Sequence, residues 1–327
     1  MVNKKVSVII LNWNGLKYLN KCIKSVKDQT YPNVEIVLID NNSSDSSFEI
    51  ATSTFNIDKF VRNSENLGFA RGMNIGIKEA TGDYLMILNM DVYLAPNAIE
   101  KAMANFVDIS NAGIVMGKEF SWNNGALINN ETRSSGPGFL KLRGQGFFDK
   151  NRINKATFSF GAMGSFPIFR REVLEQLFEI TGYYFDPKFE TGWEDKDIFF
   201  RSHHLGWKFF YNPDIIGYHS VSGSVNNKTK LIDKDLIYQQ RIFRNRYYFI
   251  YKNYPAYLLC LHFPFLLLTE LVLYPYYLYK NPKSIKALFK AQKEFIKNLP
   301  LIKIEREKIL DKSVLSVIEL LAFFKKF

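Results

Sequence analysis

Three short apolar runs, each ending at a polar side chain, constrain the fold of this chain more than any other feature. The runs are residues 6–11, which stop at Asn12, residues 34–39, which stop at Asp40, and residues 84–88, which are followed by Asn89 and Asp91. Runs this short and this rich in branched residues are typical of strands buried on both faces of a sheet. A sheet with buried strands therefore organises the N-terminal half.

Helical patterns separate these runs. Residues 16–26 have apolar side chains at helical spacing, and Ser43 or Ser44 is positioned as the N-cap of a helix that extends to Thr54. A third strand is expected at 59–61 and a helix at 68–80. Strand, helix and strand with short joints predict parallel crossovers. Because ligands of such sheets bind beyond the carboxyl ends of the strands, we expect Asn12, Asp40 and Asp91 to converge in one pocket.

A second group of chemically capable residues lies downstream. Glu194, Asp195 and Asp197 follow Trp193 and begin a predicted helix. Acids at a helix start often only compensate the helix dipole. A carboxylate held against an apolar wall such as Trp193 can instead accept a proton from a hydroxyl group. Local sequence leaves both interpretations open.

His219 ends the next apolar segment. We expect strands at 208–211 and 215–218, separated by a turn at Asn212 and Pro213, with His219 directly after the second strand. A single histidine is usually structural, but its place at a strand end also suits a metal ligand.

Composition limits the class of protein. With 327 residues, of which 47% are hydrophobic, the chain can bury one extended α/β domain with an appendage. Cys22 and Cys260 have no metal-site spacing, which favours reduced thiols. The first apolar run breaks at Asn12, too soon for a secretory signal, so we expect a cytoplasmic catalytic part.

The C-terminal region is basic and apolar. From Arg241 onward there are 16 Lys and Arg against 6 Asp and Glu, or +10 of the total +11. The stretch 254–279 is long enough to span a bilayer but contains Pro264, Pro275 and Glu270. Basic flanks on both sides favour a re-entrant or interfacial element over a single span, with a buried core helix as the third possibility. We therefore divide the chain into a catalytic domain, 1–240, and a membrane-associating helical region, 241–327, and expect no nucleic acid partner.

Five blocks taken together match a known pattern. They are VSVIILNWNG, VEIVLIDNNSSDSS, NLGFARGMNIGIKEATGDYLMILNMDV, FDPKFETGWEDKDIFFR, and GYHSVSGS with Arg244 and Asn245 after it. In this order the blocks resemble the family-2 inverting glycosyltransferases of the GT-A fold, in particular the rhamnosyltransferase-like branch. The resemblance implies a Rossmann-like, mostly parallel mixed sheet flanked by helices.

The resemblance also implies roles for individual residues. Asp40 and Asn12 would contact the nucleotide of a sugar donor, with Asn42 beside them. Asp91 and His219 would hold Mg or Mn against the diphosphate, and Asp195 would be the catalytic base, with Glu194 as its acidic neighbour. Asn89 stands where many relatives have aspartate, which leaves strict metal dependence open. From the helical pattern itself, Gly68, Arg71 and Asn74 are expected to line the donor site, and Gly76 to serve packing.

These features predict an enzyme that transfers a sugar, with inversion, from a UDP- or dTDP-sugar, dTDP-rhamnose among them. The acceptor is expected to be a hydroxyl of a growing, lipid-linked cell-surface glycan at the cytoplasmic face of the membrane. The alternatives are a polyprenyl-phosphate sugar synthase and a non-catalytic nucleotide-sugar-binding protein. A nicotinamide dehydrogenase is disfavoured because no spaced glycines follow the first strand. The sugar, the linkage and the oligomeric state are not determined by the sequence.

Overall fold

The computed structural model describes residues 4–122, 125, 127–129, 131–134, 140–143, 154–161, 164–220 and 231–324. The strands are β1 (Val6–Asn12), β2 (Val34–Asp40), β3 (Lys59–Arg62), β4 (Tyr84–Asn89), β5 (Val92–Leu94), β6 (Ala112–Ser121), β7 (Leu127–Asn129), β8 (Glu131–Ser134), β9 (Leu140–Arg143), β10 (Thr157–Ser159), β11 (Ile168–Arg170) and β12 (Lys208–His219). The α-helices are α1 (Leu19–Lys27), α2 (Ser47–Thr54), α3 (Gly68–Glu79), α4 (Ala98–Asp108), α5 (Arg171–Thr181), α6 (Glu194–His204), α7 (Leu236–Asn253), α8 (Ala256–Lys280), α9 (Lys283–Asp311) and α10 (Val317–Phe324), with a short 3₁₀ turn, η1 (Leu231–Asp233), before α7.

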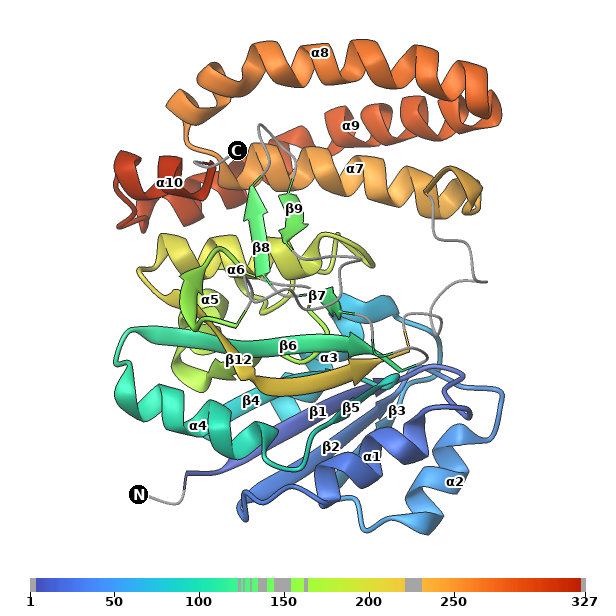
Figure 1. Cartoon of the computed structure of the whole chain (residues 1–327). Coiled ribbons are helices and arrows are strands. Elements are labelled where there is room, and N and C mark those ends of the chain that lie inside the picture. Colours follow the sequence, from blue (N-terminus) through green and yellow to red (C-terminus); the bar gives the residue numbers. More distant parts are fainter. Residues whose placement is uncertain are drawn as a thin grey trace.

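The main sheet combines a parallel and a mixed half. Its strand order is β10-β12-β6-β11-β4-β1-β2-β3, with β5 paired to β12 and β7 to β6. The predicted parallel crossovers are confirmed, because β1 pairs in parallel with both β2 and β4. In the other half β11 runs antiparallel between β4 and β6, whereas β12 is parallel to β6. The predicted α/β class, a mostly parallel mixed sheet flanked by helices, is thus confirmed (Figure 1).

Strand register brings the polar strand ends together. Asn12 pairs with Asp40 across β1 and β2, and Leu11 pairs with Asn89 across β1 and β4. On the other side of the sheet, β5 runs antiparallel to β12 with His219 opposite Val92, the residue after Asp91. Residues that are far apart in the sequence therefore meet beyond the carboxyl ends of the parallel strands.

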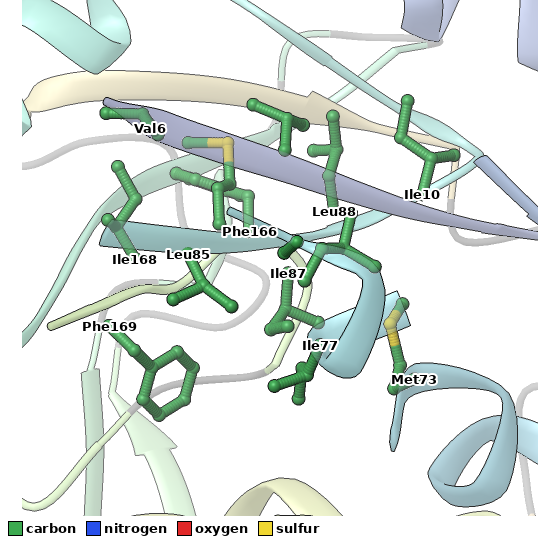
Figure 2. Close-up of a cluster of buried hydrophobic side chains, with 14 of the residues drawn as sticks. Val6, Ile10, Met73, Ile77, Leu85, Ile87, Leu88, Phe166, Ile168 and Phe169 are labelled. Atoms are coloured by element: carbon green, nitrogen blue, oxygen red, sulfur yellow. The ribbon is translucent and has the colours of Figure 1, made fainter. Parts of the chain in front are cut away.

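A continuous apolar core fixes this register. Val6, Leu85 and Ile87 are completely buried, and Figure 2 shows them packed with Ile77 of α3 and Phe169 of β11. Because these strands are buried on both faces, slippage by one residue would exchange side chains between two closely packed layers. The packing prediction for Gly76 is confirmed, since a Cβ there would overlap the Cγ2 of Ile9.

Two local predictions were wrong. Ser43 and Ser44 do not cap α2, which starts at Ser47; their hydroxyls instead bond Asp40 and Asn14. Residues 208–219 form one strand with an irregularity between Asn212 and Ile216, not two strands joined by a turn. The register of β12 against β6 shifts between Asn212 and Ile216, and the strand then resumes its pairing beyond Pro213. A turn signal alone does not reveal such a bulge.

The C-terminal helices form a layer over one side of the catalytic half. Figure 1 shows α8 outermost, with α9 and α7 beneath it and α5 and α6 between this layer and the sheet. The prolines at 264 and 275 lie inside α8, which continues through both. Our predicted division at 240/241 falls within α7, because this helix starts at Leu236. The glycine-rich stretch 136–146, apart from strand β9, lies outside the described residues.

Candidate active site

The ends of β1 and β2 form a buried polar network. The Asn12 Nδ2 donates to Asp40 Oδ1 at 2.8 Å and to Ser47 Oγ at 2.8 Å, while Asp40 also accepts from the Ser43 backbone N–H at 2.9 Å. Asn12 and Asp40 are both fully buried. These bonds hold the loop after β2, in which Asn42 is exposed and adopts a φ of 60°. Asn42 is thus the residue of this trio that faces solvent.

Helix α3 carries the three other residues expected on the donor side. Gly68 has a φ of 77°, and a Cβ there would lie 3.2 Å from the Glu190 carbonyl oxygen, so glycine permits a close backbone approach. Arg71 is exposed. Asn74, however, donates to the Phe185 carbonyl at 2.7 Å and accepts from the Phe185 N–H at 2.8 Å. Its amide joins α3 to the chain before α6, and a place beside the donor stays a prediction.

Asp91 and His219 meet at the edge formed by β5, β6 and β12. Asp91 Oδ1 lies 3.1 Å from His219 Nε2, and His219 Nδ1 bonds Glu119. Glu119 in turn accepts from Ser165 Oγ at 2.7 Å. Burial disfavours a charged imidazole here, but Glu119 and Asp91 on either side raise the pKa of His219 to about 10. The ring is held between two carboxylates.

This arrangement fits a divalent cation. Asp91 Oδ1 and His219 Nε2, which lie 3.1 Å apart, would hold such a cation once the imidazole has lost its proton. Histidines that bind metals usually donate their second nitrogen to a carboxylate, as His219 does to Glu119. Within the described ranges no group of three or more His, Cys, Asp and Glu side chains is arranged for a metal. A cation would therefore take its remaining ligands from substrate oxygens and water.

Asp195 lies in the first turn of α6. Its Oδ2 accepts from the Gly164 N–H at 3.3 Å, and its Oδ1 accepts from the Lys196 N–H at 2.8 Å. The side chain is 16% exposed, so it is neither sealed from solvent nor free in it. Burial and the adjacent Asp195 charge raise the pKa of Glu194 to about 8. Near neutral pH Glu194 therefore keeps its proton beside Asp195.

The turn at 164–165 connects both acidic groups. Gly164 donates to Asp195, while Ser165 donates to Glu119 and accepts from the Asn89 N–H at 2.9 Å. Glu119 holds His219, which contacts Asp91. Asp91 and Asp195 therefore approach the same turn from opposite halves of the chain.

Sequence reasoning missed the residues that hold the loop before Asp195. This segment, residues 186–193 (the 186–193 loop), contains Glu190 and Trp193 in left-handed backbone conformations. The Asn245 Nδ2 of α7 lies within hydrogen-bonding distance of three of its carbonyls, at 2.6 Å, 3.0 Å and 2.8 Å. Arg244 donates to the Lys188 carbonyl at 2.8 Å. Their appearance as an adjacent pair in the fifth sequence block was the available signal.

Fold and site together define a GT-A-like α/β protein with an acidic site at the carboxyl ends of its parallel strands. Residues 7–178, more than half of the chain, match the family model described as glycosyl transferase family 2. The chain belongs to this family and is a glycosyltransferase. Glycosyltransferase GlyG of Streptococcus pneumoniae is 26% identical over 68% of this chain and 73% of its own length. The chain spans 22% of the length of another relative, glycosyltransferase GlyA of the same organism, to which it is 28% identical over 48% of its own length.

Solved structures agree in fold. Staphylococcus aureus TarS 1-349 in complex with UDP-GlcNAc has a TM-score of 0.54 at 18% identity, covering 94% of this chain and 89% of that one. The mannosyltransferase PcManGT from Pyrobaculum calidifontis, in complex with GDP-Man and Mn2+, has a TM-score of 0.53 at 16% identity, covering 97% and 87%. At these identities the likeness concerns the fold alone.

Proposed function

We propose that this glycosyltransferase moves a sugar from a nucleotide-diphosphate sugar to a hydroxyl of a growing, lipid-linked cell-surface glycan, with inversion. The observation that carries the proposal is the 164–165 turn, which contacts Asp195 directly and reaches Asp91 through Glu119 and His219. One acid is thus available to the nucleophile and another to the leaving group, as a single displacement requires.

Asp195 is the base in this proposal. Its Oδ2 accepts the proton of the acceptor hydroxyl while that oxygen bonds the anomeric carbon, and the bond from that carbon to the diphosphate breaks with its electron pair on the leaving oxygen. The Gly164 and Lys196 N–H groups orient the carboxylate. Glu194, protonated at neutral pH through its raised pKa, adds no second negative charge beside it.

Asp91 and His219 are proposed to hold Mg or Mn at the diphosphate. Such a cation, when bound, supplies positive charge to the departing oxygen. Glu119 orients the His219 ring, and Ser165 orients Glu119. The neutral Asn89 provides one charge fewer than an aspartate there, so the dependence on the metal is the first property to measure.

A nucleotide-sugar donor is supported by the ligands of the two fold neighbours, UDP-GlcNAc in TarS and GDP-Man in PcManGT. We place the nucleotide at the loop that Asn12 and Asp40 hold, with Asn42, Gly68 and Arg71 at its margin. The pyrimidine donors UDP- and dTDP-sugars, including dTDP-rhamnose, are the proposed set.

A location at the membrane, and with it a lipid-linked acceptor, is supported by α8; the cytoplasmic face is part of the proposal. Among the described residues, α8 is the helix whose length and composition suffice to cross a membrane, and 11% of its most apolar window is buried. The same observation favours a second candidate, transfer to polyprenyl phosphate itself. The mass of the product recovered from lipid extracts separates the two.

A panel of UDP- and dTDP-sugars, with and without Mn2+, tests the proposal on the purified chain. Asp195→Asn is expected to lower transfer by about 100-fold or more while donor binding persists. Asp108→Asn, at an exposed aspartate of α4, is the matched control. If Asp195→Asn transferred the sugar at the rate of the unaltered chain, the assignment of the base would be refuted. If the unaltered chain bound the donor without turnover, a non-catalytic binding protein would be favoured.

A further inference from the structure

Helix α8 has two faces of different character. Leu258, His262 and Tyr277 are buried against the rest of the helical layer. The rest of the helix surface carries large apolar side chains that are 45% to 82% exposed, namely Leu261, Phe263, Phe265, Leu267, Leu268, Leu271, Val272, Tyr276, Leu278 and Tyr279. Figure 1 shows this helix at the outer surface, away from the sheet. An apolar face of this extent on a soluble surface marks an interaction site.

The charged residue within α8 points into the protein. From Ala256 to Tyr279 the only charged side chain is Glu270. Its Oε1 pairs with Arg246 NH1 at 2.6 Å, and its Oε2 accepts from Tyr247 Oη at 2.8 Å, both on α7. Burial together with the Glu270 charge raises the pKa of Tyr247 above its usual range. The carboxylate is therefore paired on the inner side, and the outer face of α8 carries no charged side chain before Lys280 at its end.

These contacts argue against a single span. A helix crossing the bilayer would separate Glu270 from Arg246 and Tyr247 and leave an unpaired carboxylate near the centre of the hydrocarbon, which is strongly unfavourable. The partner helix α7 cannot follow it, because Asn245 and Lys252 attach α7 to the catalytic half. A helix lying in the plane of the interface keeps every one of these contacts.

Positive charge lies next to the apolar face. Helix α9 packs beside α8, joined to it by the bond from Tyr274 Oη to Gln292 at 2.6 Å. It exposes five lysines, Lys283, Lys286, Lys290, Lys293 and Lys297, together with Phe289 and Ile296. Lysines beside an apolar face suit a layer of anionic lipid headgroups over acyl chains. A second copy of this chain would instead bring the same lysines toward one another.

We infer that the outer face of α8 and these five lysines of α9 form a docking surface that lies flat on an anionic lipid bilayer without crossing it. The proposed membrane location does not say which lipids the protein binds, and this inference names them as anionic lipids. It does not depend on the transfer reaction, because lipid binding is measured without donor or acceptor.

Vesicle sedimentation tests the docking surface with the full chain. The chain is expected to sediment with vesicles of phosphatidylglycerol and phosphatidylcholine, more weakly with phosphatidylcholine alone, and less as salt increases. Leu271→Glu is expected to lower binding at least tenfold, whereas the control Val107→Glu, at a similarly exposed position on α4, leaves it unchanged. Equal loss in both variants, or a stable dimer that binds no vesicles, would overturn the inference.

Depth measurements separate an in-plane helix from a spanning one. Leu261, Leu268 and Tyr279 are all exposed, lie near one line along α8, and cover 18 residues or about 27 Å. Single cysteines at these positions, in a Cys260→Ser background, would carry a polarity-sensitive fluorophore. Lipids with quenchers at fixed depths are expected to give one common shallow depth for all three labels. A label at 268 deep in the bilayer with the other two near its surfaces would show a span and overturn the inference.

Discussion

Glu194 and Asp195 are adjacent in sequence but lie in different surroundings. Asp195 accepts two backbone N–H groups, whereas the Glu194 Oε2 is buried with no hydrogen-bond partner among the described residues. Burial and the Asp195 charge raise the pKa of Glu194 to about 8. We therefore expect Glu194→Gln, which imitates the neutral acid, to keep transfer within about tenfold, while Glu194→Ala loses more because it leaves a cavity.

The same raised pKa makes stability depend on pH. Between about pH 4.5 and pH 8 the folded chain keeps the Glu194 proton and the unfolded chain releases it, so rising pH lowers the free energy of unfolding. The stabilisation that comes from the retained Glu194 proton is complete below about pH 4.5 and is lost above about pH 8. Urea unfolding across this window should show a fall in the unaltered chain that Glu194→Gln lacks. Parallel pH profiles for the two proteins would contradict this prediction.

Residue-level prediction from the sequence succeeded where a strand end fixes the position. Asn12 and Asp40 were expected together and are bonded. Glu119 and Ser165 were missed, because β6 reaches His219 through a long-range parallel pairing with β12 and Ser165 reaches it through Glu119, and no local pattern encodes either contact. The bond of the Asn74 amide to Phe185 was not predicted for the same reason, since its partner lies 111 residues away.

Among the elements, the link between α7 and the 186–193 loop is the most consequential for the site. Left-handed backbone at a non-glycine residue costs about 1–2 kcal/mol, and this loop contains two such residues, Glu190 and Trp193. Asn245 contacts three loop carbonyls and so holds the loop that leads directly into Asp195. We expect Asn245→Ala to lower the turnover number about 10- to 100-fold with little change in donor KM.

A double-mutant cycle distinguishes positioning from general destabilisation. If Asn245 acts through the base, its replacement should cost much less in an Asp195→Asn background. Asn298→Ala is the matched control, because that amide joins α9 to Tyr248 and does not touch the loop. Fully additive losses would indicate that Asn245 stabilises the fold without positioning Asp195.

Packing of α3 on the parallel strands allows a stability prediction. A Cβ at Gly76 would overlap Ile9 of β1 and lie 3.1 Å from Ile39 of β2. Gly76→Ala is therefore expected to lower the free energy of unfolding by about 1–3 kcal/mol, although alanine favours helix. Urea unfolding checks this, with Lys78→Ala at an exposed α3 position as the control. Increased stability in Gly76→Ala would show that α3 can shift without cost.

For the whole molecule, sequence patterns predicted the parallel strands of the sheet better than the arrangement of the C-terminal helices. The parallel strands β1 to β4 were placed almost to the residue, because continuous apolar runs and short joints leave few alternatives. The stacking of α7, α8 and α9 on the catalytic half was not predicted, since the apolar stretch 254–279 alone suits a span, an interfacial helix or a core helix. The ion pair between Glu270 of α8 and Arg246 of α7 depends on how these helices pack, and it argues against the span.

A buried ionic network attaches the C-terminal helices to the catalytic half. Lys252 of α7 pairs with Asp186 at 2.6 Å and with Asp197 of α6 at 2.8 Å, and all three side chains are at most 2% exposed. Asp197 also pairs with the buried Arg201 at 2.7 Å. Removing Lys252 would leave Asp186 without its closest counter-charge in a buried site, so Lys252→Met is expected to lower the free energy of unfolding by about 3–5 kcal/mol.

Adding Asp186→Asn to Lys252→Met should recover part of this loss, because it removes the carboxylate that Lys252 neutralised. The control is Lys208→Met, whose pair with Glu319 is 28% and 46% exposed and is expected to contribute less than about 1 kcal/mol. Urea unfolding monitored by tryptophan fluorescence measures all four proteins. If Lys252→Met lost no more stability than Lys208→Met, the helical layer would be attached to the catalytic half mainly by apolar contacts. A single shared transition, shifted as a whole by Lys252→Met, is expected because the network joins α6, which carries Asp195, to α7.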